Sequence, residues 1–166
     1  MKKLTNKKII VLAILLLGVV IVGAGLFTKK DKGYQEGIVL DSIVLNSYNN
    51  EAAQTKDEIM KKPYLLIEFF TLRCPHCKKN IPHLNELNKH NKISVIGYIN
   101  NNSRKVRSYA RENNVEFTLS RASREYTKIF NPVAVPMSFL IDTKTLKVKK
   151  SFIGELTSKK VLEYIN

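Results

Sequence analysis

LLIEFFTLRCPHCKK, residues 65–79, is an apolar run that ends on two cysteines. Cys74 and Cys77 are the only cysteines among the 166 residues of the chain. The nearly continuous apolar stretch 64–70 predicts a strand that is buried on both faces of a mostly parallel sheet. The cysteines therefore follow directly on the carboxyl end of a central strand.

The hydrophobic period changes from strand to helix at the cysteines. Apolar residues then recur at helical spacing, at Ile81, Leu84 and Leu87. We expect a helix from Cys74 to about His90, with a kink at the internal Pro82.

Other elements follow from the same period analysis and from turn residues. Expected are one or two short strands within 38–45, a helix 55–61, strands 92–99 and 115–119, helices 103–114, 124–130 and 158–165, and strands 137–141 and 147–153. The first helix has a capping box, Thr55 to Glu58, and stops before Pro63. This order predicts one α/β domain in which the first strands are parallel and the last two form an antiparallel hairpin.

The amino terminus has the pattern of a membrane anchor. Residues 1–8 contain four lysines, and residues 9–27 follow without a charge. This length suits a transmembrane helix, whereas the apolar part of a cleaved signal peptide is usually shorter. Cleavage near residues 22–24 stays open. The lysine bias predicts a cytoplasmic tail 1–8, an anchor 9–27, a tether 28–37 and an extracytoplasmic domain 38–166 in the cell membrane.

The chain is strongly basic, with a formal net charge of +14. Such a charge makes nucleic acid or an anionic membrane surface a possible partner. The lysines are spread along the whole chain, and neither a glycine-flanked aromatic motif nor a dense basic helix is visible. We therefore expect no nucleic-acid partner.

The cysteine spacing predicts redox chemistry, since a bridge across a four-residue loop removes little chain entropy. A sulfur at a helix N-terminus is stabilised as its thiolate. Cys74 is expected to be the exposed nucleophile and Cys77 the more buried resolving thiol. Pro75 fixes the first helical position. The neighbouring groups Arg73, His76, Lys78 and Lys79 should favour the anion.

Glu68 and the Val135-Pro136 pair are further candidates. Burial within an apolar run would raise the pKa of Glu68, which could then exchange protons with Cys77 through a water. A place at a solvated edge is the alternative. Local sequence favours a trans bond before Pro136, whereas a cis bond would turn the backbone of Val135 toward Cys74 and an extended substrate.

A zinc site is the competing use of two such cysteines. It would need two more ligands from His76, His83 and His90, and these cannot easily complete the site. We expect no metal and no cofactor other than the redox-active disulfide.

The segments EFFTLRCPHCKK and VPMSFLID resemble the thioredoxin superfamily over about residues 38–166. The Pro-His pair between the cysteines is similar to DsbA-type oxidases, whereas CKKNIPHLNEL and the absence of a large helical insertion resemble the membrane-anchored TlpA/ResA group. This resemblance implies a three-layer fold around a central mixed sheet. It also implies that Cys74 attacks, Cys77 resolves, Glu68 is the buried acid and Pro136 is a cis-proline.

The direction of electron flow is predicted from the charge at the motif. Arg73 stands where many relatives carry Trp, so a cationic site should favour an oxidase that introduces disulfides into exported proteins. The alternatives are a TlpA/ResA-like reductase, for example of apocytochrome c, and a non-catalytic binding or chaperone module. Val135, Pro136 and Arg73 are expected to contact the substrate, and a membrane redox partner to reset the cysteines.

Overall fold

The computed structural model describes residues 35–165. Its elements are α2 (Lys56–Met60), β1 (Tyr64–Phe69), α3 (Pro75–Lys89), β2 (Ile93–Tyr98), α4 (Ser103–Glu112), β3 (Thr118–Ser120), α5 (Arg124–Phe130), β4 (Met137–Asp142), β5 (Lys147–Ile153) and α6 (Ser158–Leu162). From residue 56 onward, the order of strands and helices predicted from the sequence is confirmed. The capping box at the start of α2 is also present, with Thr55 and Glu58 each bonded to the other's backbone N–H.

A five-stranded mixed sheet forms the centre of the domain, in the order β3-β2-β1-β4-β5. Strands β1, β2 and β3 are parallel, and β4 runs antiparallel to both β1 and β5. The predicted parallel start and antiparallel end are therefore correct. The strand before the cysteines, β1, lies in the middle of the sheet, as its apolar sequence requires.

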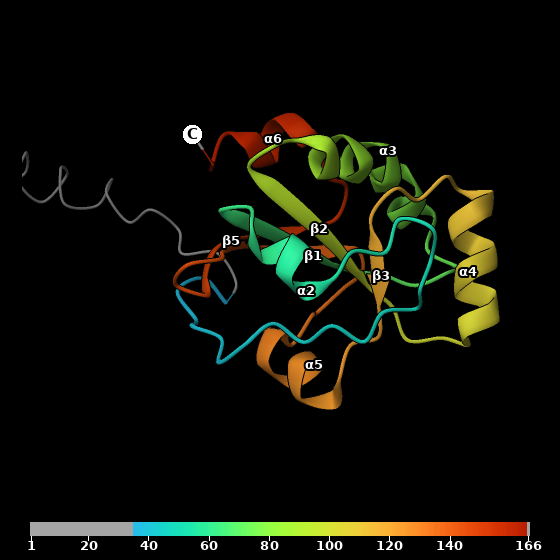
Figure 1. The fold of residues 1–166 in the computed structure, drawn as a ribbon, viewed down its shortest axis with the longest axis horizontal. Coiled ribbons are helices and arrows are strands. Elements are labelled where there is room, and N and C mark those ends of the chain that lie inside the picture. The colour runs from blue at the N-terminus through green and yellow to red at the C-terminus, as the bar shows by residue number, and fades with distance from the viewer. Residues whose placement is uncertain (1–34, 166) are drawn as a thin grey trace, which may run out of the picture. The chain divides into compact units, whose positions relative to one another are not determined.

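Helices cover both faces of the sheet, because alternate residues of β1 point in opposite directions. Leu66 joins a core cluster with residues of α3, α4 and α6, whereas Leu65 and Ile67 join a second cluster with residues of α2 and α5. In Figure 1, α3 and α6 lie on one side of the sheet and α5 on the other. The predicted three-layer arrangement is confirmed.

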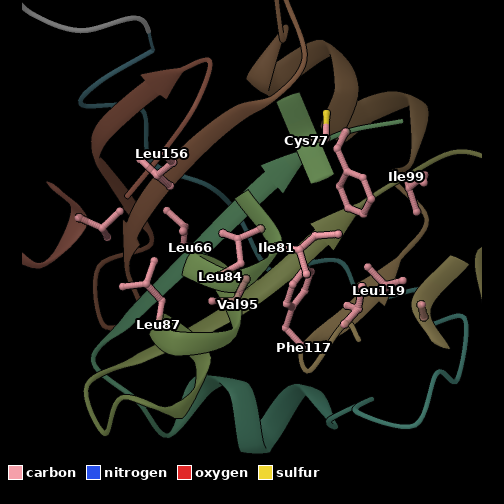
Figure 2. Close-up of a cluster of buried hydrophobic side chains, with 14 of the residues drawn as sticks. Leu66, Cys77, Ile81, Leu84, Leu87, Val95, Ile99, Phe117, Leu119 and Leu156 are labelled. Carbon is pink, nitrogen blue, oxygen red and sulfur yellow. The ribbon is translucent and has the colours of Figure 1, made fainter. Parts of the chain in front are cut away.

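The cluster under α3 contains both cysteines. Figure 2 shows Ile81, Leu84 and Leu87 of this helix directed at the sheet, with Cys77 in the same apolar layer. The helix continues through Pro82 to Lys89 as one element. The apolar face that the sequence predicts therefore packs the helix against the sheet.

One predicted strand is absent, and two predicted boundaries are wrong. Residues 38–45 form no strand: they make one isolated bridge, Val39 to Lys147, because only a few of their backbone groups bond to β5. Strand β3 begins at Thr118 rather than 115, since the N–H of Val115 is used to close α4 at the carbonyl of Ala110. Helix α6 ends at Leu162, three residues early.

The predicted tail and anchor, residues 1–27, lie outside the described residues, as does the tether up to residue 34. Within 35–165, no helix has both the length and the apolar character needed to cross a membrane.

One glycine of β2 leaves space for the aromatic ring of Phe70. Gly97 is paired with Glu68 in the sheet, and a Cβ at this position would lie 2.5 Å from Cε1 of Phe70. It would also lie 2.9 Å from atoms of Phe117 and of Leu119. Phe70 belongs to the core cluster that contains both cysteines. The core around Gly97 is therefore packed without room for one more methyl group.

We predict that Gly97→Ala destabilises the domain by about 1–3 kcal/mol through overpacking. Urea unfolding at equilibrium measures the change. In a Phe70→Leu background the same substitution should cost less, because the nearest clashing atom is gone. An equal cost in both backgrounds would contradict the steric explanation.

Candidate active site

The two cysteines form a disulfide at the first turn of α3. Cys74 is the N-cap residue, and its Sγ accepts a hydrogen bond from the backbone N–H of Cys77 at 3.1 Å. The sulfur therefore lies at the positive end of the helix, where a thiolate is stabilised. As predicted, Cys77 is the more buried, with 1% of its surface exposed against 8% for Cys74.

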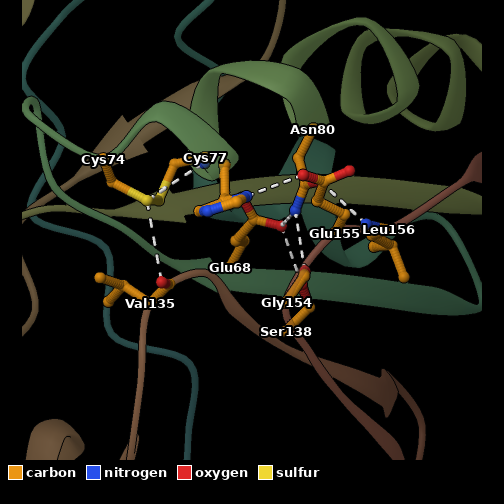
Figure 3. Close-up of a disulfide and its surroundings, with 10 residues drawn as sticks. Glu68, Cys74, Cys77, Asn80, Val135, Ser138, Gly154, Glu155 and Leu156 are labelled. Atoms are coloured by element: carbon orange, nitrogen blue, oxygen red, sulfur yellow. Dashed lines mark hydrogen bonds and ion pairs between the residues drawn. A yellow bond between two sulfur atoms is a disulfide. The ribbon is translucent and has the colours of Figure 1, made fainter.

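Cys74 is less exposed than the sequence suggested, because the loop before β4 covers it. The carbonyl oxygen of Val135 lies 3.7 Å from Sγ of Cys74 (Figure 3). A disulfide sulfur has no proton, so this contact becomes a hydrogen bond only when the thiol forms. The bond between Val135 and Pro136 is cis, as the resemblance implied and the local sequence did not. Val135 itself keeps 41% of its surface exposed.

Glu68 is buried beneath the first turns of α3, with 1% of its surface exposed. This excludes the solvated edge that was the alternative position. Its Oε2 accepts hydrogen bonds from Oγ of Ser138 at 2.8 Å and Nδ2 of Asn80 at 3.0 Å. Burial raises the pKa of Glu68 to about 7, although the two hydrogen bonds act in the opposite direction. The group can therefore hold or release a proton near neutral pH.

Asn80 connects Glu68 to the loop between β5 and α6. Its Nδ2 also donates to the carbonyl of Gly154 at 3.3 Å, and its Oδ1 accepts from the backbone N–H of Leu156 at 2.8 Å. The side chain is completely buried, and Asn80 was not among the site residues predicted from the sequence. Its position beside Ile81 on the apolar face of the helix could have indicated a structural role. An amide that is buried there must find hydrogen-bond partners.

The charges around the motif differ from the prediction, because Glu155 lies beside two of its groups. Its Oε1 lies 2.7 Å from Nζ of Lys79 and 2.7 Å from Nδ1 of His76. Hydrogen bonds from Lys79 and then from His76 hold the pKa of Glu155 below its ordinary value. His76 and Lys79 were assigned to the thiolate, but the structure pairs both with a carboxylate. No local pattern pointed to Glu155, because it follows His76 by 79 residues.

Of the remaining residues singled out in the sequence, three lie near Cys74 and two lie further along α3 or at its end. Arg73 and Pro75 are exposed on either side of Cys74, and Lys78 is exposed in the next turn. His83 and His90 are further along the chain, and within residues 35–165 no group of three or more His, Cys, Asp and Glu side chains could hold a metal ion.

The model of the Redoxin family matches residues 37–165, which is most of the chain. The chain belongs to the Redoxin family. The cysteine pair lies within the matched region and forms a disulfide at the start of a helix.

Similar proteins are thiol-disulfide oxidoreductases. The chain is 26% identical to thiol-disulfide oxidoreductase ResA of Bacillus thuringiensis subsp. konkukian, over 85% of this chain and 82% of the relative. It is 25% identical to sporulation thiol-disulfide oxidoreductase A of Bacillus subtilis, over 60% of this chain and 64% of the relative. The predicted enzyme class is confirmed: this Redoxin protein is a thiol:disulfide oxidoreductase.

Solved structures share the fold. The crystal structure of StoA from Bacillus subtilis superimposes with a TM-score of 0.54 at 23% identity, over 63% of this chain and 84% of that one. A thiol:disulfide interchange protein of the thioredoxin family from Chlorobium tepidum superimposes with a TM-score of 0.65 at 18% identity, over 79% and 98% of the two chains. The domain therefore has a thioredoxin-like fold.

Glu68 should make the stability of this Redoxin domain depend on pH. Between its ordinary pKa of 4.5 and about 7, the folded protein keeps a proton on Glu68 that the unfolded chain has lost. The stabilisation is complete below pH 4.5 and is lost as pH rises through 7, by about 3 kcal/mol. Glu68→Gln should remove this loss.

The measurement is urea unfolding of the oxidised protein at several pH values from 4.5 to 8, for wild type and variant. Other titrating groups are common to both proteins and cancel in the difference. If the two proteins lose stability in parallel as pH rises, Glu68 is not the buried acid described above.

Proposed function

We propose that this Redoxin protein reduces disulfide bonds in exported proteins, outside the cytoplasmic membrane. The observation that carries the proposal is the contact of Glu155 with His76 and Lys79. The oxidase prediction rested on Arg73 and on a cationic site around Cys74, to which His76 and Lys79 were expected to contribute. A carboxylate that contacts both weakens the stabilisation of the Cys74 thiolate, so the disulfide form is a weaker oxidant.

The position of Glu68 supports the same direction. Above its pKa of about 7 a buried negative charge lies under the first turns of α3, on the sheet side of the cysteines. A carboxylate in this place opposes ionisation of a nearby thiol. The match to proteins named ResA also supports the TlpA/ResA-like alternative over the DsbA-like one.

The reaction begins with the dithiol protein. The thiolate of Cys74 attacks one sulfur of a substrate disulfide, and the other substrate sulfur leaves as a thiolate and takes up a proton. Cys77 then loses its proton, for which Glu68 is the proposed acceptor through a water, and attacks Sγ of Cys74. The Cys74–Cys77 disulfide forms, the second substrate sulfur leaves, and two electrons have passed to the substrate.

The substrate is proposed to bind as an extended segment against the loop before β4. The backbone of Val135 lies next to Sγ of Cys74, and Val133 and Val135 expose apolar side chains there. Arg73 is exposed before the motif and completes the proposed contact surface, whereas Pro136, which was also expected to contact the substrate, is buried.

The proposed location follows from the first 34 residues. Residues 9–27 are proposed to anchor the protein in the cell membrane with the tail 1–8 in the cytoplasm and the domain outside. A thiol donor in the membrane would return two electrons to the Cys74–Cys77 disulfide after each cycle.

The competing function is the oxidase. It is favoured by the exposed Arg73 beside Cys74, and by the Pro-His pair between the cysteines. Both functions use the same cysteines, and the reduction potential of the pair separates them.

We predict a midpoint potential below about −250 mV, close to that of thioredoxin and well below the roughly −120 mV of DsbA. Equilibration with mixtures of reduced and oxidised dithiothreitol, followed by thiol alkylation, measures it. The value should be the same for the domain with and without the first 34 residues. A potential above about −200 mV would support the oxidase instead.

We also predict that Cys77→Ser traps substrate on Cys74. Without the resolving thiol, the mixed disulfide cannot be displaced and should accumulate on a model protein disulfide such as that of insulin. Nonreducing gel electrophoresis detects the adduct. The matched variant Cys74→Ser should form little adduct, and equal trapping by both variants would contradict the assignment of Cys74 as the attacking thiol.

A further inference from the structure

The loop that carries Glu155 is fixed to the site on both sides of this residue. The N–H of Gly154 donates to the carbonyl of Pro136 at 2.9 Å, and the carbonyl of Gly154 accepts from Asn80. The N–H of Leu156 donates to the same Asn80, and its side chain is 1% exposed. Gly154 has a φ of +84°, which a glycine adopts without strain. The position of Glu155 is therefore set by buried contacts.

The carboxylate of Glu155 is directed at the cysteine motif from this loop. It contacts His76, which lies between the two cysteines, and Lys79, one turn further along α3 (Figure 3 shows Glu155 beside Asn80). An isolated exposed pair would have little effect. Here one carboxylate joins two groups of the motif, and its backbone is held by the residues that also hold Glu68.

We propose that Glu155 is a positioning residue that lowers the reduction potential of the Cys74–Cys77 disulfide. It does so by accepting hydrogen bonds from His76 and Lys79 and balancing the positive charge that Lys79 would otherwise present to Cys74. This deepens the proposed function, since it rests on the redox chemistry of that site. It assigns a role to a side chain on the loop between β5 and α6, remote in sequence from the motif.

The electron balance shows where the charge matters. Reduction by a thiol reagent breaks the Cys74–Cys77 bond and adds two electrons and one proton, which leaves a thiolate on Cys74 and a thiol on Cys77. Negative charge thus appears on Cys74 only in the reduced form. Positive charge near it favours the reduced form and makes the disulfide more oxidising, and a neighbouring carboxylate does the opposite.

The test is the equilibrium constant between the Cys74–Cys77 disulfide and dithiothreitol, measured for wild type and Glu155→Gln. The substitution should favour the reduced protein about threefold, which is about 14 mV for a two-electron couple. It should also lower the pH at which the Cys74 thiolate forms, followed by its ultraviolet absorbance. Both changes should shrink at 1 M salt, because solvent-exposed charges are screened.

Glu116→Gln is the matched control. Glu116 also contacts a lysine, Lys89, and its side chain is 48% exposed against 49% for Glu155. It lies between α4 and β3 and contacts the far end of α3, so its substitution should leave the equilibrium constant unchanged. An equal shift of the equilibrium constant in both variants would mean that only the net charge of the protein matters, and it would overturn the proposal.

A second background tests whether Glu155 acts through its two partners. When His76→Gln and Lys79→Gln are both present, Glu155→Gln should shift the equilibrium much less than in wild type. A full shift in this background, or no shift in the wild-type background, would overturn the proposal. A wild-type potential above about −200 mV would instead overturn the proposed direction of electron flow and leave the role of Glu155 standing.

Discussion

The buried side chain of Asn80 connects the parts of the active site. Its amide reaches Glu68 in β1, the carbonyl of Gly154 and the N–H of Leu156, so one residue of α3 joins the central strand to the loop before α6. Removing such an amide would leave buried polar groups without partners, each at a cost of about 1–3 kcal/mol. The geometry of the disulfide, the buried acid and the loop of Glu155 therefore depend on one another.

This connection places two carboxylates around the cysteines with different environments. Glu68 is buried and titrates near neutral pH, so it suits proton exchange with the deeper thiol. Glu155 is half exposed and held by two hydrogen bonds that lower its pKa, so it keeps its charge at neutral pH. One acid can thus change protonation during the cycle while the other supplies a fixed charge.

The sequence predicted the features that depend on local pattern. The apolar run 64–70 and the helical period after Cys74 located the central strand and the motif helix. Alternation within the strand left two positions possible for Glu68, and only the fold shows that it is buried. The prediction failed for residues 38–45, whose apolar residues Leu40 and Ile43 are buried without a regular strand. Burial of apolar side chains does not by itself make a segment a strand. A strand also needs regular backbone hydrogen bonds, and this segment makes only a few with the edge of the sheet at β5.

Long-range contacts explain why the charge of the site was misjudged. In the sequence His76 and Lys79 lie near Cys74 without an acidic neighbour, but in the fold Glu155 contacts both from a loop more than 70 residues away. The four-residue motif defines the chemistry of the sulfurs, whereas their potential depends on every charge that the fold brings near them. The Pro-His pair alone therefore does not define the potential, because in this fold the carboxylate of Glu155 also contacts the motif.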